Sequence, residues 1–333
     1  MKRIFVILCT FLLIICLSIG GLFAAKKVIS MYRNIWDALD NLSAVTQYSA
    51  SQIDETTQKI DILNAHLHTL STQVDHLHRE AFRSNDSVAT GYDYSWIDSA
   101  PPYIAHACGG IDGTTYTNSR EAFISNYELG HRVFEIDFNL SDDGILIASH
   151  DEDTWRRLTG SDLPYTSEHF NQLPLLNGYS SLSCSDVVEL MAAHPDVYVV
   201  TDTKATTQNE VMLAFSQLVH CAQKSHPEVL KRIIPQIYSE EMLPWISSIY
   251  PFRSVIFTLY QLRWTPDSIL NFCMNSGIRF ITMPADQLTE DVLRLFDTLD
   301  IQVAVHTIND KTEANTFFDM GVDMIYTDFL INN

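Results

Sequence analysis

The sequence of 333 residues predicts an α/β fold: a TIM (β/α)8 barrel with a hairpin excursion after its second strand. Three observations support this prediction. After Pro102, apolar strand-like runs alternate with helical stretches, a pattern typical of a parallel sheet. One of the nine runs follows its predecessor across the tight turn Ser141–Gly144, too short for a parallel crossover, so eight parallel strands remain. Ionisable residues also gather where strands end, which is where such barrels place their chemistry.

Residues 1–25 precede this fold and are strongly apolar. The run from Ile4 to Ala25 is long enough to cross a bilayer core of about 30 Å, so we expect an uncleaved transmembrane anchor. A cleaved signal peptide is the alternative, because Lys2 and Arg3 precede the run, but a clean small-x-small cleavage site is lacking. Basic residues flank the run on both sides and do not decide its orientation. A short basic N-terminus before a large C-terminal domain favours a barrel on the extracytoplasmic side.

Residues 26–83 show a heptad pattern. With Leu39 at position a, the a and d positions are mostly apolar up to Arg83, and neither Pro nor Gly interrupts the segment after Ile35. Such a pattern is typical of a coiled coil, and predicts a stalk roughly 70 Å long that joins copies of the chain into a homo-oligomer. The alternative is a single amphipathic helix that lies on the main domain.

Residues 84–102 are polar and end in two prolines, so we predict a linker there. The barrel then occupies residues 103–333. Its predicted strands are Tyr103–Ala105, Val133–Phe138, Ile145–Ser149, Val197–Thr201, Ile233–Ile237, Val255–Leu259, Phe280–Met283, Gln302–Val305 and Met324–Thr327. Its predicted helices include Asp186–Ala193, Glu210–Lys224, Ser268–Asn275, Glu290–Leu299 and Lys311–Met320.

The charge of the chain argues against two classes of partner. The formal net charge is −20, and the excess of acidic residues lies after Arg83. An acidic domain of this kind is not expected to bind nucleic acid or to adhere generally to an anionic membrane.

Three carboxylates at predicted strand ends indicate a metal site. Glu135 and Asp137 are two residues apart, so their side chains point to the same face of one strand. Asp202 ends the next parallel strand. Carboxylates that share a buried face repel one another unless a cation lies between them. Three of them suit a hard divalent ion, Mg²⁺ or Ca²⁺.

Two histidines and a lysine complete the predicted site. His106 ends the first strand and His150 follows the return strand of the hairpin. Two histidines suit a general acid and a general base. Lys204 lies on the same face as Asp202 and suits an anionic, phosphoryl transition state.

The motifs that carry these residues resemble a known family. The segments "IAHACGG", "NSREAF", "FEIDFNLSDDGILIASHD", "VVTDTK" and "GVDMIYTD" look like the glycerophosphodiester phosphodiesterase family, within the phosphatidylinositol-phospholipase-C-like phosphodiesterases. The resemblance covers Tyr103 to Leu330. It implies a TIM barrel, a divalent metal and cleavage of a phosphodiester next to a hydroxyl. It also implies the roles of the residues: His106 and His150 as the acid/base pair, Lys204 at the phosphate, and as metal ligands Glu135, Asp137 and Asp202.

The chain departs from the family pattern beside its first histidine. The family has Arg there, and this chain has Ala107 followed by Cys108. One phosphate contact is therefore missing, and the basic residues that would be candidates to replace it are Arg132, Arg156 and Arg157.

Three further departures concern the substrate pocket. Thr117, followed by Asn118, stands where the family has Glu, and Asp202 stands where the third metal ligand is Glu. Sphingomyelinase-D-like barrels look similar at that last position. His306 stands where the family has an aromatic residue. These changes leave the reaction class in place, but they put simple glycerophosphodiesters in question as substrates.

The sequence thus predicts a membrane-anchored, divalent-metal-dependent phosphodiesterase. The expected substrate is a phosphodiester small molecule, a lipid head group or a glycerophosphate polymer. Two alternatives remain: a sphingomyelinase-D-like or cyclising phospholipase, and a catalytically inactive barrel that acts as a binding or scaffold module.

Overall fold

The chain divides into two units, residues 1–86 and residues 87–333. The computed structural model describes residues 91–261 and 263–332, together with six helical residues of the first unit: Ser30, Arg33, Asn34, Ile53, Thr57 and Lys59. The predicted anchor, residues 1–25, and nearly all of the predicted stalk, residues 26–83, lie outside the described residues. Within the part that the structure describes, every helix is too short or too polar to span a membrane.

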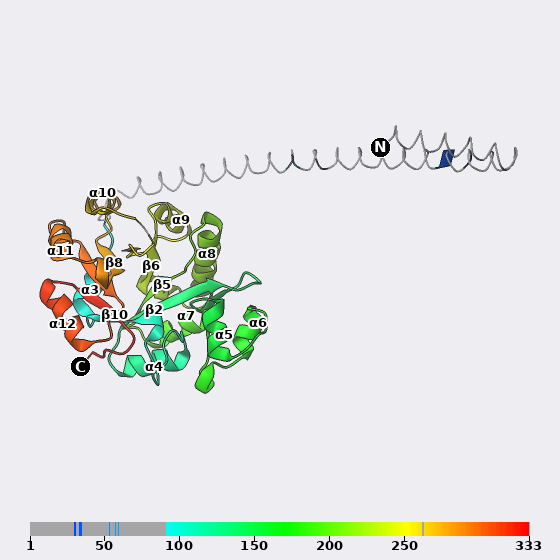
Figure 1. The fold of residues 1–333 in the computed structure, drawn as a ribbon, viewed down its shortest axis with the longest axis horizontal. Helices are drawn as coiled ribbons and strands as arrows, with labels where there is room; N and C mark the ends of the chain where they lie inside the picture. The colour runs from blue at the N-terminus through cyan, green and yellow to red at the C-terminus, as the bar shows by residue number, and fades with distance from the viewer. Residues whose placement is uncertain are drawn as a thin grey trace, which may run out of the picture. The chain divides into compact units, whose positions relative to one another are not determined.

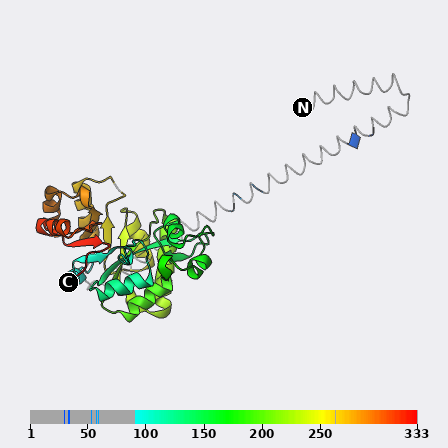
Figure 2. The same ribbon diagram turned by 60° about the horizontal axis from the view of Figure 1, so that its bottom comes forward.

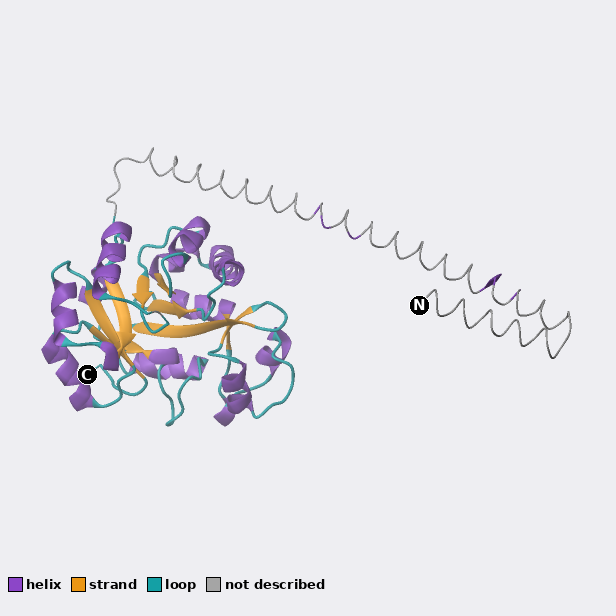
Figure 3. Ribbon diagram, turned by 45° about the horizontal axis from the view of Figure 1, so that its top comes forward, coloured by secondary structure: helices purple, strands orange, loops and turns teal. Residues whose placement is uncertain are grey.

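The second unit is a closed barrel of eight parallel strands, which confirms the predicted barrel fold. The first and second strands, β1 and β2, pair at Ile104 and Val133 and so close the sheet. Figure 3 shows the strands inside and the helices outside. The barrel strands are β1 (Tyr103–Ala105), β2 (Val133–Leu140), β5 (Tyr198–Asp202), β6 (Ile233–Ile237), β7 (Ile256–Thr258), β8 (Phe280–Pro284), β9 (Gln302–His306) and β10 (Met324–Thr327).

Helices surround the strands, as Figure 1 shows. Side chains at their N-termini accept hydrogen bonds from free backbone N–H groups, as Ser183 does for α7 and Thr265 does for α10. Gly277 and Gly321 end α10 and α12 in the left-handed conformation. The outer helices are α4 (Arg120–Glu128), α7 (Cys184–Ala193), α8 (Gln208–Ser225), α9 (Met242–Ile249), α10 (Pro266–Ser276), α11 (Glu290–Asp297) and α12 (Lys311–Met320). Short 3-10 helices are η1 (His106–Cys108), η2 (Leu176–Gly178), η3 (Pro227–Arg232) and η4 (Ala285–Gln287).

The predicted hairpin is present after β2. The strand β3 (Leu146–Ala148) runs antiparallel to β2, and Gly144, with φ of +73°, lies in the turn between them. The two-residue strand β4 (Leu182–Ser183) pairs with β3. The helices α5 (Glu152–Thr159) and α6 (Ser167–Gln172) lie between β3 and β4 in the chain. Figure 2 shows this green region and the orange-to-red helices on different sides of the strands.

The last part of the predicted linker belongs to the barrel. Residues 95–99 form a short helix, α3 (Ser95–Ser99). Its Trp96 side chain is 3 % exposed and packs against Tyr198 and Phe280, with ring centroids 5.7 and 5.6 Å away. The Trp96 Nε1 donates a hydrogen bond to Ser254 Oγ at 3.1 Å. The domain therefore begins before Tyr103, because an aromatic side chain of the polar segment contributes to the core.

The inner face of the barrel changes character along the strands. Near their N-terminal ends, apolar side chains from all eight strands form one buried cluster with Trp96 and Ile97 of α3. On β2 this face continues from Val133 to Glu135 and Asp137, since alternate residues point the same way. The apolar half therefore serves as a core, and the carboxylates lie above it at the C-terminal end.

Candidate active site

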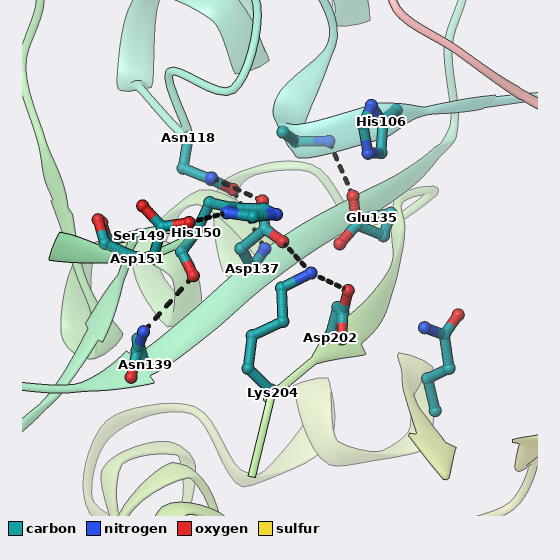
Figure 4. Close-up of polar contacts among 12 residues, drawn as sticks. His106, Asn118, Glu135, Asp137, Asn139, Ser149, His150, Asp151, Asp202 and Lys204 are labelled. Atoms are coloured by element: carbon teal, nitrogen blue, oxygen red, sulfur yellow. Dashed lines mark hydrogen bonds and ion pairs between the residues drawn. The ribbon is translucent and has the colours of Figure 1, made fainter. Parts of the chain in front are cut away.

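Three buried carboxylates meet at the C-terminal end of the barrel. The parallel register of β2 and β5 places Asp137 beside Asp202, and Glu135 lies on the same face of β2. Each side chain offers one oxygen, and these oxygens lie within 4.8 Å of one another. Figure 4 shows the arrangement. The structure therefore brings together the three predicted metal ligands.

The chemistry of this cluster fits a hard divalent cation. Glu135 Oε2 accepts a hydrogen bond from the backbone N–H of Ala107 at 2.7 Å, whereas Glu135 Oε1 is buried and has no hydrogen-bond partner among the residues that the structure describes. Burial, together with the charge of Asp137, raises the pKa of Glu135 to about 8. A cation would supply the missing partner and relieve the repulsion. Carboxylate oxygens are the ligands that Mg²⁺ and Ca²⁺ prefer.

Asn118 holds Asp137 in place from the loop after η1. Its amide donates to Asp137 Oδ2 at 2.9 Å, and its Oδ1 accepts from the Asp137 backbone N–H at 3.0 Å. Burial alone would raise the pKa of Asp137, but the charge of Lys204 and the nearby histidines lower it overall. The sequence motif contains Asn118 but does not indicate its role. Its two hydrogen bonds depend on a left-handed backbone, with φ of +44°, that the sequence does not reveal.

Lys204 lies between two of the carboxylates. Its Nζ is 2.9 Å from Asp137 Oδ1 and also forms an ion pair with Asp202. Burial by itself would lower the pKa of Lys204, but the charges of Asp137 and Asp202 raise it. The hydroxyl of Tyr238 donates to Asp202 and accepts from the Lys204 backbone N–H at 3.2 Å. Tyr238 therefore fixes both the third carboxylate and the segment that carries the lysine.

The two predicted histidines are each oriented by a carboxylate. His106 Nδ1 lies 2.8 Å from Asp328 Oδ1, and His150 Nδ1 lies 2.5 Å from Asp151 Oδ2. Asn309 supports the first pair, because its amide donates to Asp328 Oδ2 at 2.8 Å. A carboxylate that accepts from Nδ1 leaves Nε2 of each imidazole available for a substrate.

The environment of His106 favours its protonated form. Burial lowers the pKa of His106, but the hydrogen bond to Asp328 and the charges of Glu135 and Asp137 outweigh burial and raise the pKa to about 9.

Neither orienting carboxylate was predicted as a site residue. Asp151 directly follows His150, and Asp328 ends the motif "GVDMIYTD". Both residues therefore lie in recognised motifs, but the sequence does not show that they bond to the histidines.

His306 lies at the end of β9 and lines the same end of the barrel. Its Nδ1 is 3.1 Å from Thr282 Oγ1, and its ring meets Tyr260 and Tyr326 edge-on, each with centroids 5.9 Å away. Burial, with the charges of His106 and Lys204, lowers the pKa of His306 to about 4. The side chain is therefore neutral at ordinary pH.

The arginines considered as replacements for the family Arg lie elsewhere. Arg132 precedes β2 at the opposite end of the barrel and pairs with Asp196 at 2.7 Å. Arg156 pairs with Glu152 of its own helix at 2.6 Å, and Arg157 is exposed on that helix. Ala107 itself is buried and contributes its backbone N–H to Glu135. Arg132 therefore lies at the wrong end of the barrel to take over the phosphate contact, whereas for Arg156 and Arg157 this role stays a prediction.

Solved structures share this fold. An Oleispira antarctica phosphodiesterase, in complex with the product sn-glycerol-3-phosphate, matches with a TM-score of 0.59 and 16 % identity over 70 % of this chain and 95 % of its own. Glycerophosphodiester phosphodiesterases from Parabacteroides distasonis (TM-score 0.56, 18 % identity, 69 % and 94 % covered) and Thermotoga maritima (0.53, 21 %, 68 % and 94 %) also match. At these identities the likeness shows the fold alone. The search of curated proteins found no match.

A family profile gives stronger evidence of relationship than these structural matches do. The Glycerophosphoryl diester phosphodiesterase family matches residues 110–332, which is more than half of the chain. The matched region contains the three carboxylates, Lys204 and His150, and His106 lies just before it. The chain therefore belongs to the glycerophosphoryl diester phosphodiesterase family, whose members are phosphoric diester hydrolases.

Proposed function

We propose that this protein is a divalent-metal-dependent glycerophosphodiester phosphodiesterase that uses His106 and His150 as its acid/base pair. One observation carries the proposal: two histidines, each oriented through Nδ1 by a carboxylate, lie around a buried cluster of three carboxylates. Family membership supports an enzyme rather than a scaffold.

The charged residues would have two roles, which are binding of the cation and stabilisation of charge on the phosphate. Glu135, Asp137 and Asp202 would hold the cation, which, when bound, would neutralise and polarise the phosphodiester. The Lys204 ammonium, which already lies between two carboxylates, would contact the phosphoryl oxygens and stabilise the charge that develops on them. The carboxylates and Lys204 together make this end of the barrel suited to bind a phosphate.

The histidines move the protons. The neutral imidazole takes a proton from the attacking hydroxyl at Nε2, and the protonated imidazole gives a proton to the leaving alcohol. The orienting carboxylates keep the Nε2 atoms directed at the substrate and stabilise each imidazolium when it forms. The attacking group is either water or a hydroxyl next to the phosphate; the second case yields a cyclic phosphate first.

The sequence of the N-terminal region supports a place for this activity at a membrane surface. The apolar run of residues 1–25 supports a membrane anchor, and the heptads of residues 26–83 support a coiled-coil stalk that joins copies of the chain. The barrel would then act on the extracytoplasmic side, on a lipid head group or a glycerophosphate polymer at the surface.

The test is an assay of the full-length protein against glycerophosphodiesters, lysophospholipids and sphingomyelin, with Mg²⁺, Ca²⁺ or a chelator. Phosphorus NMR identifies the products. We expect metal-dependent release of a glycerol phosphate that is lost in His106→Ala and kept in the surface control His220→Ala. Turnover that persists in chelator, or in His106→Ala, would contradict the proposal. Accumulation of a cyclic phosphate would instead identify the cyclising reaction.

A further inference from the structure

The ring of Tyr116 contacts both histidines. Its centroid is 4.8 Å from that of His106 and 5.0 Å from that of His150, with interplanar angles of 80° and 77°. Both contacts are therefore edge-on, an arrangement that aromatic rings prefer over face-to-face stacking. Tyr116 takes no part in the steps described above, yet it touches both of the groups that move protons.

The backbone holds Tyr116 in this place. Its φ of +61° lies in the left-handed region, which a tyrosine adopts only where the surrounding structure fixes it. The loop is fastened on both sides: the hydroxyl of Tyr179 donates to Asp112 Oδ2 at 2.5 Å, and the backbone N–H of Asn118 donates to the Ala107 carbonyl at 3.2 Å. The strained conformation is thus a stable feature of the site.

The two histidines come from separate elements and differ in their support. His106 follows β1, and its side chain is 14 % exposed and bonded to Asp328. His150 follows β3 of the hairpin, and its side chain is 31 % exposed and bonded to the adjacent Asp151. Asp151 fixes one edge of the His150 ring but not the distance to His106. The Tyr116 ring, in contrast, contacts both imidazoles.

We propose that Tyr116 is a positioning residue that sets the spacing and tilt of the His106 and His150 imidazoles, so that both reach one phosphodiester. This role rests on the proposed function, because it assumes that the two histidines act on the same substrate. The contacts are made by the ring, so the hydroxyl is not required. Burial and the charge of Asp328 raise the pKa of the phenol, which keeps the residue uncharged.

Kinetics of the full-length protein with Mg²⁺ and a glycerophosphodiester test the role. We expect Tyr116→Phe to retain most of the activity, because it keeps the ring. Tyr116→Ala should lower kcat on the order of 100-fold, the effect of a misplaced catalytic group, and leave KM nearly unchanged. Tyr127→Ala is the matched control, because Tyr127 lies at the C-terminal end of α4, beside Arg132 and away from the catalytic groups. A Tyr116→Phe variant as impaired as Tyr116→Ala would overturn the proposal.

A second measurement does not depend on turnover. Histidine labelled with ¹³C at Cε1 gives one NMR signal for each side chain, and His106→Gln and His150→Gln assign the two that matter. Loss of the Tyr116 ring current should shift both signals in Tyr116→Ala and neither in Tyr116→Phe. Unmoved signals in Tyr116→Ala would overturn the positioning role, whatever the activity. Absence of turnover in the wild-type protein would contradict the proposed function, while the NMR result would still decide whether the Tyr116 ring contacts both histidines.

Discussion

His106 and His150 are not equivalent, and their surroundings suggest different tasks. His106 is the more buried and is bonded to Asp328, and its pKa is raised to about 9. A raised pKa suits the group that protonates the leaving alcohol, so we expect His106 to have that role. We then expect His150, the more exposed of the two, to accept a proton from the attacking hydroxyl.

The nature of the leaving group tests this assignment. Replacing either histidine by Ala should reduce turnover of an alkyl phosphodiester by about 100- to 10,000-fold, the usual contribution of general acid or base catalysis. A p-nitrophenyl phosphodiester has a leaving group that needs no proton. On that substrate His106→Ala should lose far less activity than His150→Ala. Equal losses for both variants on both substrates would show that the tasks are not divided in this way.

The lowered pKa of His306 in the folded protein predicts a loss of stability in acid. Its pKa falls from 6.5 to about 4 on folding. Between these values the unfolded chain takes up a proton that the folded protein does not, so stability decreases as the pH falls from 6.5 to 4. The full loss, reached below pH 4, is about 3 kcal/mol. Thermal unfolding should show a shallower decline in His306→Gln than in the wild type or in His220→Gln. Parallel curves would mean that His306 titrates alike in both states.

The sequence identified the ionisable site residues, but it did not identify the residues that contact and orient them. Glu135 and Asp137 could be placed on one face because strand periodicity depends only on neighbouring residues. Asp328 could not be paired with His106, because the two are 222 positions apart and meet only when the barrel closes. Asn118 and Tyr116 depend on left-handed backbone conformations, which leave little mark on a sequence in residues other than glycine.

At the scale of elements, the helix α3 closes the N-terminal end of the barrel. Trp96 is nearly fully buried there, so Trp96→Ala should lower the free energy of unfolding by about 3–5 kcal/mol, as for other large aromatic side chains. Chemical denaturation measures this change. Divalent-metal binding by the folded variant, followed by calorimetry, should be unaffected, because the carboxylates lie at the other end. Wild-type stability in Trp96→Ala would show that α3 does not contribute to the core.

Elements with a clear apolar pattern were predicted well, whereas the short elements β4 and α3 were missed. The predicted helix Lys311–Met320 agrees with α12, because Asp310 caps its start and Gly321 ends it. The strand β4 has two residues and is defined by its partner β3, so it carries no pattern of its own. The helix α3 was hidden in a polar segment because its two apolar residues, Trp96 and Ile97, pack against strands from the rest of the chain.

At the scale of the whole molecule, the predicted stalk, if it forms a coiled coil, would determine how many barrels act together. A chain from Asn34 to Asn333 should sediment as an oligomer at micromolar concentration, because it retains the heptads. A chain from Ser84 to Asn333 should sediment as a monomer with the same turnover per barrel. A monomeric longer chain would contradict the coiled coil. Oligomers of the shorter chain would place the contact in the barrel instead.

The bond between His106 and Asp328 has a consequence for the order of events in the cell. It joins the first strand of the barrel to the residue that follows the last. A chain still emerging from the ribosome contains both histidines and all three carboxylates long before Asp328 is available. The proposed acid–base residue His106 is therefore oriented only after Asp328 has been synthesised, and a polypeptide truncated before Asp328 contains every proposed metal ligand but no oriented His106.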